Sequence, residues 1–146
     1  MNLFLGSDHR GFKLKEKLKE WLGQKKIDFV DLGPEKFDPE DDYPDMAQKL
    51  ALKIVDEKSR GILLCGSGAG MEIAANKVKG IRAAIGFNPQ QVRKMVEDDD
   101  VNILCLAADY ISKFKAFQLT KIFLNSQFIN KGKYLRRVEK IKKLEI

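Results

Sequence analysis

Hydrophobic and polar positions follow two periodicities in turn along the whole chain. Short, nearly continuous apolar runs predict strands at residues 2–5, 27–32, 61–65, 81–85 and 102–106. Between and after them, apolar side chains recur every three or four residues, which predicts helices at about residues 12–23, 43–56, 71–78, 89–97, 113–125 and 134–144. The chain is therefore expected to alternate between strand and helix, the pattern of the α/β class.

Strands separated by helices favour right-handed parallel crossovers. The expected architecture is a three-layer α/β/α sandwich of Rossmann-like type around a five-stranded parallel sheet. The run at 61–65 has no polar side chain, which is typical of a central strand buried on both faces. No repeat or linker-like tract interrupts the pattern, so residues 1–146 are expected to form a single domain.

The segment after the third predicted strand is the sharpest local feature. It has the sequence Cys65-Gly66-Ser67-Gly68-Ala69-Gly70, at the strand end where parallel sheets bind ligands. The glycines allow close backbone approach, and the next helix begins with unpaired N–H groups, so this loop is expected to bind an anion. It lacks the Gly-Lys-Ser/Thr of ATP-binding loops and the spacing of the dinucleotide fingerprint, which argues against ATP and NAD.

Cys65 is the candidate reactive group of this loop. Helix dipoles and nearby cations are expected to lower the pKa of its thiol, which would make it a usable base or nucleophile. The alternative is an inert buried cysteine, an interpretation that suits Cys105 better because Cys105 lies inside its strand.

A second group of candidates follows the first predicted strand. Asp8, His9 and Arg10 place a carboxylate, the single imidazole of the chain and a guanidinium side by side. This trio suits a phosphorylated polyol, although Asp8 is about equally expected to cap the following helix. Tyr43 is a weaker candidate that would add a phenol. The acidic run at 97–100 is interpreted as a charged loop, and its spacing specifies no cation, so no metal site is predicted.

The charge distribution and the cysteines limit the partners and the compartment. The net charge is +6, with ten Lys or Arg against two Glu in residues 113–146. This basic end is interpreted as a solvated surface, and nucleic acid is not expected because no motif that reads it is present. Two cysteines without metal or disulfide spacing, and a start without a signal or membrane segment, predict a cytoplasmic protein that does not bind membranes.

Five segments together resemble the ribose-5-phosphate isomerase B family, which includes the galactose-6-phosphate isomerase subunits. They are Gly6 to Lys15, Asp42-Tyr43-Pro44-Asp45, Ile62 to Gly70, Ala74-Ala75-Asn76-Lys77 and Gly80-Ile81-Arg82-Ala83. The resemblance covers nearly the whole chain. It implies a cofactor-free aldose–ketose isomerase of a sugar phosphate. The assembly would be a homodimer, or a tetramer formed by two dimers, in which the C-terminal helix reaches the partner subunit.

The resemblance also implies a role for each motif residue. Cys65 would take the proton from C2 of the open-chain aldose to form a cis-enediolate, and Ser67 would help to stabilise the charge on its oxygens. The other substrate contacts would come from Asp8, His9, Tyr43, Gly66, Gly68, Ala69, Gly70 and Arg137, with His9 and Arg137 on the phosphate.

The chain departs from the family pattern at four positions. Asp98 and Asp99 replace a His-Asn pair whose His helps to open the furanose ring, Asp109 replaces an Arg, and Lys133 replaces the first Arg of a C-terminal pair. Asp98 is retained as the catalytic candidate by position, and Asp99 and Lys133 as substrate contacts. The candidates to replace the lost Arg are Arg10, Arg136 or a lysine.

Three functions therefore remain open. The favoured one is an isomerase that interconverts D-ribose 5-phosphate and D-ribulose 5-phosphate. The second is an isomerase of another phosphorylated sugar, such as a hexose 6-phosphate. The third is a protein that binds a sugar phosphate with little catalysis.

Overall fold

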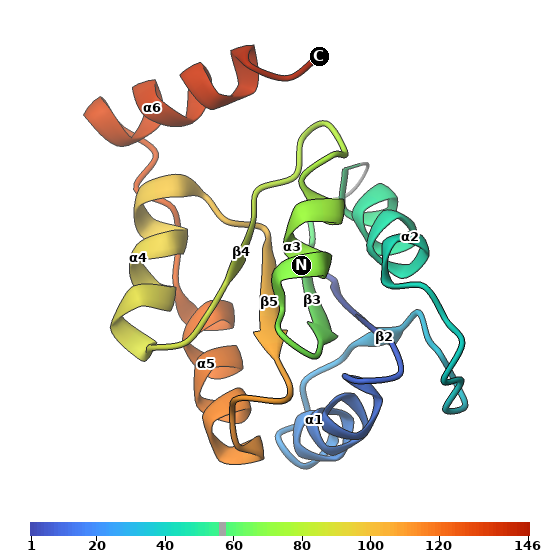
Figure 1. Ribbon diagram of the computed structural model, residues 1–146. Helices are drawn as coiled ribbons and strands as arrows, with labels where there is room; N and C mark the ends of the chain where they lie inside the picture. Colours follow the sequence, from blue (N-terminus) through green and yellow to red (C-terminus); the bar gives the residue numbers. More distant parts are fainter. Residues whose placement is uncertain (56–57) are drawn as a thin grey trace.

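The computed structural model describes residues 1–55 and 58–146, in which strands and helices alternate (Figure 1). The elements are β1 (Leu3–Ser7), α1 (Phe12–Gln24), β2 (Val30–Asp31), α2 (Tyr43–Val55), β3 (Arg60–Cys65), α3 (Ala69–Ala75), β4 (Ala83–Ile85), α4 (Pro89–Asp99), β5 (Ile103–Ala107), α5 (Lys113–Asn125) and α6 (Gly132–Lys143). The strands form one parallel sheet in the order β2-β1-β3-β5-β4. The predicted α/β class and five-stranded parallel sheet are confirmed.

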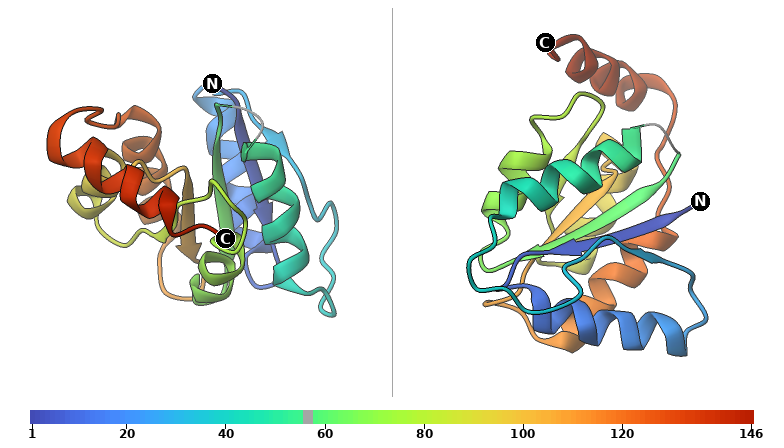
Figure 2. Two further views of the ribbon diagram at one scale, coloured as in Figure 1. Left: turned by 90° about the horizontal axis from the view of Figure 1, so that it is seen from above. Right: turned by 90° about the vertical axis from the view of Figure 1, so that its right-hand side faces the viewer.

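Helices cover both faces of the sheet (Figure 2). On one face, Leu5 and Leu104 pack with apolar side chains of α1, α4 and α5. On the other face, Phe4 and Leu63 pack with α2 and α3. Side chains of successive strand residues point to opposite faces, so a strand covered on both sides is apolar throughout. This explains why all five residues of both β1 and β5 are buried.

The second strand is shorter than the predicted run at 27–32. Lys26 has a positive φ of 57°, and the backbone N–H of Ile27 donates to the carbonyl of Leu22 at 2.9 Å. This left-handed turn ends α1 and satisfies one of its free carbonyls. Ile27 and Phe29 then pack against the core from outside the sheet. The prediction of a strand from 27 was wrong because these apolar residues serve the end of the helix.

Two helices also differ from their predicted ranges. α3 begins at Ala69 and ends at Ala75, so both of its ends are earlier than in the predicted range of 71–78. It ends there because the side chain of Asn76 donates to the carbonyl oxygen of Ala83 and accepts its backbone N–H, each at 2.8 Å. α4 runs on to Asp99, so most of the acidic run lies in its last turn, and the interpretation of 97–100 as a loop was wrong. The predicted end of α2 at residue 56 lies outside the described residues.

A buried lysine fixes the path of the chain after β2. The Nζ atom of Lys15 lies 2.8 Å from Oδ1 of Asp31 and 2.8 Å from the carbonyl oxygen of Pro34. Burial alone would raise the pKa of Asp31, but hydrogen bonds from Lys15 and Lys19 outweigh it and hold this pKa below its usual value. These bonds anchor the start of the long segment that leads to Tyr43.

α6 extends away from the rest of the chain (Figures 1 and 2). It approaches α4, and its Val138 is 1% exposed, whereas Ile141 on the same helix is 37% exposed and Leu144, just after the helix, is 80% exposed. Part of the apolar stripe of α6 is therefore left exposed by the residues that the structure describes. That α6 reaches a partner subunit stays a prediction.

Candidate active site

The sequence-predicted site residues fall into two groups at opposite edges of the sheet. Helices of a parallel α/β fold run back against the strands, so strand ends and helix ends lie at opposite edges, about 17 Å apart for a five-residue strand. Figure 1 shows the arrowhead of β5 pointing away from α6. The strand-end group contains Asp8, His9, Tyr43, Cys65, Gly66, Ser67, Gly68, Ala69 and Gly70. The helix-end group contains Asp98, Asp99, Lys133 and Arg137.

Cys65 is the last residue of β3 and is 4% exposed. Burial raises the pKa of its thiol, and this effect outweighs the backbone N–H groups of Met71 and Gly68, which lower it. The charge of Asp8 raises the pKa further, while Arg10 lowers it. The expectation of a lowered pKa was wrong, because desolvation outweighs the start of α3 here. A raised pKa also means that the thiolate, once formed, is a stronger base.

The loop after Cys65 meets the ring of Tyr43. Gly68 has a positive φ of 81° and precedes α3, and the Oγ atom of Ser67 accepts the N–H of Ala69 at 3.3 Å. A Cβ on Gly70 would lie 2.7 Å from two ring carbons of Tyr43, so only glycine lets the ring approach this closely. The predicted phenol therefore does lie beside the predicted loop.

Asp8 is buried behind this loop, with 5% of its surface exposed. Its Oδ1 accepts the backbone N–H of Gly11 at 2.9 Å, just before α1. Burial raises its pKa and outweighs the hydrogen bond from Gly11. Gly11 is the N-cap of α1 and the helix has no side-chain cap, so Asp8 holds the turn before α1 and the predicted capping role was wrong. The predicted contact with substrate hydroxyls stays a prediction.

His9 is held by Asp41, a partner that the sequence did not reveal. The Nδ1 atom of His9 lies 2.7 Å from Oδ1 of Asp41, which also accepts the backbone N–H of His9 at 3.0 Å. The hydrogen bond to Asp41 raises the pKa of His9, so the imidazolium form is favoured. The two residues are 32 positions apart, and no local pattern connects them. A cationic ring at this edge suits an anionic ligand.

This pairing leads to a prediction for the Asp41→Asn variant. We expect the pKa of His9 to fall, because asparagine can still accept the backbone N–H but carries no charge. The imidazolium–carboxylate pair is present below the raised pKa and is lost as the pH rises through it. The chain has a single histidine, so an NMR titration of its ring proton measures this pKa directly. Asp38→Asn in the same loop is the control, and an equal midpoint in all three proteins would contradict the pairing.

The helix-end group lies where negative charge is concentrated at the C-terminal end of a helix, an unfavourable position for it. Glu97, Asp98 and Asp99 occupy the last turn of α4, where the helix dipole favours cations. Burial and the charge of Asp98 raise the pKa of Asp99, while Arg137 on α6 lowers it. The Oδ1 atom of Asp98 is buried and has no hydrogen-bond partner in the part of the chain that the structure describes. Such breaks with local preference are typical of functional surfaces.

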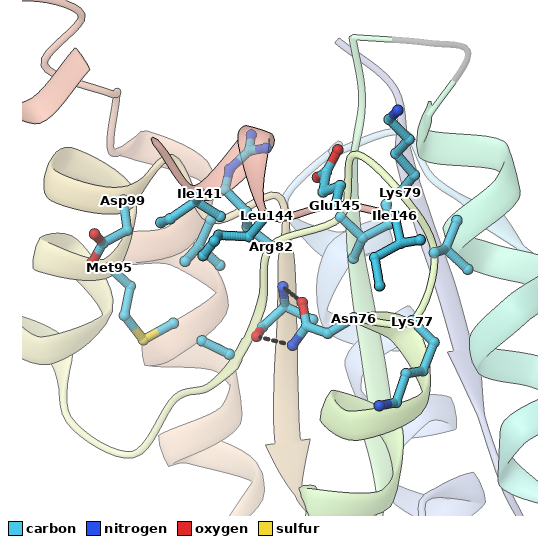
Figure 3. A pocket seen from close by; sticks show the side chains of 15 residues that line it. Asn76, Lys77, Lys79, Arg82, Met95, Asp99, Ile141, Leu144, Glu145 and Ile146 are labelled. Atoms are coloured by element: carbon cyan, nitrogen blue, oxygen red, sulfur yellow. Dashed lines mark hydrogen bonds between the residues drawn. The ribbon is translucent and has the colours of Figure 1, made fainter. Parts of the chain in front are cut away.

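A cavity of about 650 Å³ opens beside this group, between the end of α3, the start of β4, α4 and the C-terminal segment (Figure 3). Asp99, Ile141 and Leu144 line it, so exposed apolar residues at the end of α6 and just after it face a hollow. Asn76 and Ala83, which are joined by two hydrogen bonds, also line it, and Figure 3 draws these bonds beside Asn76. The cavity belongs to the edge away from Cys65.

Residues 1–55 and 58–146 contain neither a metal-binding cluster nor a membrane-spanning helix. No group of three or more His, Cys, Asp or Glu side chains in these ranges is arranged to hold a metal ion. None of their helices is both long and apolar enough to cross a membrane.

Comparison with known proteins connects this arrangement to sugar-phosphate isomerases. The probable ribose-5-phosphate isomerase B of Mycoplasma genitalium is 39% identical, over 99% of this chain and 95% of that protein. The crystal structure of ribose-5-phosphate isomerase B from Mycoplasma genitalium with bound ribulose-5-phosphate has a TM-score of 0.92 at 38% identity, over 98% of this chain and 95% of that one. The Thermotoga maritima ribose 5-phosphate isomerase has a TM-score of 0.92 at 39% identity, over 97% of both chains. Residues 3–141 match the Ribose/Galactose Isomerase family, and the chain belongs to that family.

Proposed function

We propose that this protein is an aldose–ketose isomerase that interconverts D-ribose 5-phosphate and D-ribulose 5-phosphate. The observation that carries the proposal is the position of Cys65 at the end of β3, between the buried carboxylate of Asp8 and the loop that packs on Tyr43. The relative from Mycoplasma genitalium, with the same fold at 38% identity, was crystallised with ribulose-5-phosphate.

The proposed reaction is a proton transfer between neighbouring carbons. The Cys65 thiolate takes the proton from C2 of the open-chain aldose, and the C–H electron pair forms a C1–C2 double bond as the C1 carbonyl becomes an oxyanion. The loop N–H groups and Ser67 stabilise this charge. The thiol then returns the proton to C1, and the proton of the O2 hydroxyl passes to the O1 oxyanion, which leaves a ketone at C2 and a hydroxyl at C1. The step is redox-neutral overall, so these residues need no cofactor for it.

We further propose that the protein works as a homodimer in which each site takes residues from both chains. In one chain, the Cys65 group and the group with Asp98, Asp99, Lys133 and Arg137 lie at opposite edges. A two-fold axis that places the helix-end group of one chain on the Cys65 edge of its partner completes two sites at once. The exposed Ile141 and Leu144 supply apolar surface for this contact.

A second candidate substrate rests on Asp98. A carboxylate occupies the position where the resemblance expects a ring-opening histidine, which favours a sugar phosphate with a different ring or one that opens in solvent. A hexose 6-phosphate is the alternative substrate on this ground.

The two buried, unpaired cysteines suit a reducing compartment, and we place the protein in the cytoplasm.

The test is conversion of D-ribose 5-phosphate to D-ribulose 5-phosphate by the purified protein without added metal. We expect turnover, with ribose 5-phosphate giving the highest kcat/KM across a panel of aldose phosphates. A higher value for a hexose 6-phosphate would replace the substrate but retain the reaction class. Saturable binding of every sugar without exchange of the C2 proton in deuterated water would overturn the enzyme and leave a binding protein.

A further inference from the structure

Arg10 lies across the loop that follows Cys65. A Cβ added to Gly66 would lie 2.8 Å from Nη1 of Arg10 and closer still to Nε and Cζ, so the guanidinium rests directly on this glycine. Gly66 in turn accepts the backbone N–H of Asp109 at 3.1 Å. The loops that follow β1, β3 and β5 therefore meet beside Cys65. Arg10 supplies the positive charge at this meeting point.

Asp109 holds this guanidinium from the opposite side. The Nη2 atom of Arg10 forms an ion pair with Oδ2 of Asp109, across 99 positions of sequence. A guanidinium has five N–H donors, and this bond uses one terminal nitrogen, so donors remain for a ligand. The side chain of Arg10 is 55% exposed, which leaves these donors accessible from solvent.

The surroundings of Arg10 favour an anion. Arg10 and Asp109 share a hollow of about 320 Å³ with Lys13 and Lys17 of α1. The carboxylate of Asp109 offsets one of these three positive charges, and the lysines keep the local field positive. His9 is the residue immediately before Arg10. Its pairing with Asp41 favours the cationic form of its imidazole.

We propose that Arg10 binds the phosphate of the substrate in this half of the site, with Asp109 as the residue that positions it. This inference rests on the proposed function and names a binding residue within it. The resemblance expects an arginine at position 109, just after β5. In this chain Asp109 occupies that position, and Arg10, which follows β1, brings a guanidinium to the same place. Arginine suits the task because its planar fork matches two phosphate oxygens at once.

The test compares three variants by steady-state kinetics with ribose 5-phosphate. We expect Arg10→Ala to raise KM at least about tenfold, the loss of one charged hydrogen-bonding group, while kcat changes less than about threefold. The inhibition constant of inorganic phosphate should rise by a similar factor. The double variant Arg10→Ala/Asp109→Arg, which moves the guanidinium to the other strand end, should recover most of the loss. Lys121→Ala on the exposed surface of α5 removes one positive charge elsewhere and is the matched control.

Two results would overturn the inference. One is an unchanged KM and phosphate inhibition constant in a folded Arg10→Ala protein. The other is a KM in the double variant no better than in Arg10→Ala. If the wild-type protein turns over no ribose 5-phosphate, the proposed function fails separately, and calorimetric titration with inorganic phosphate decides the inference. Equal affinity of the wild type and Arg10→Ala for phosphate would then refute it, and affinity lost only in Arg10→Ala would support it.

Discussion

Replacing Cys65 with alanine is expected to lower kcat for ribose 5-phosphate at least about 10³-fold and to stop exchange of the C2 proton with deuterated water. The reason is that the variant has no base at the end of β3, while the loop and Asp8 remain in place. Cys65 is a small member of the buried core, and alanine removes only its sulfur atom, so the variant should still fold. Proton exchange, measured by NMR on the sugar, separates loss of the base from loss of binding.

The matched control is Cys105→Ala. Cys105 is fully buried within β5, and its substitution should cost about 1 kcal/mol of stability with kcat unchanged. Because burial raises the pKa of Cys65, the wild-type kcat/KM should also rise with pH through the neutral range, as more thiolate forms. Exchange at the wild-type rate in a folded Cys65→Ala protein would remove Cys65 from the mechanism.

The parts of the fold that depend on local pattern could be predicted from the sequence. The five strands and six helices occur in the predicted order because each buries a face whose spacing is visible in the chain. The errors lie at ends, where one residue serves two purposes. Ile27 is apolar and β-branched, yet its N–H closes the end of α1, and the strand begins later. Hydrophobic periodicity alone cannot show that competition.

The candidate site, like the fold, could be predicted only where its residues are close together in the sequence. Residues of one motif, such as Cys65 and Gly66, lie together because they are consecutive. Pairs from distant segments, such as His9 with Asp41 and Arg10 with Asp109, depend on strand order, which no local spacing encodes. The carboxylate of Asp109, where the resemblance expects an arginine, is balanced by Arg10 in this way. The separation of the predicted site residues between two edges follows because α4 runs antiparallel to the strands, and it becomes visible only with the fold.

The acidic end of α4 is the feature that a single chain explains least. Three carboxylates in the last turn oppose the helix dipole, and one buried oxygen of Asp98 has no partner in the described chain. A partner chain that brings its Arg10, Lys13 and backbone N–H groups to this surface would supply the missing donors and positive charge. The same contact would bring Arg137 to the partner's Cys65. One arrangement would therefore account for the acidic end of α4 and for the separation of Arg137 from Cys65 within one chain.

Mixing two inactive variants is expected to restore about a quarter of the wild-type activity if each site is shared between chains. Cys65→Ala removes the base from one half-site, and Arg137→Ala removes from the other the phosphate contact that the resemblance implies. In a heterodimer of the two, one site carries both defects and the other carries neither. Random exchange of equal amounts makes half of the dimers hybrid, and each hybrid has one intact site.

The measurement is the initial rate at low substrate, before and after subunit exchange of differently tagged variants. Arg137→Ala mixed with Lys133→Ala is the control, because both substitutions lie on α6 and every hybrid site keeps one defect. That mixture should stay at the level of its parents. A Cys65→Ala and Arg137→Ala mixture that also stays there, despite proven hybrids, would mean that Cys65 and Arg137 do not serve the same site across the dimer.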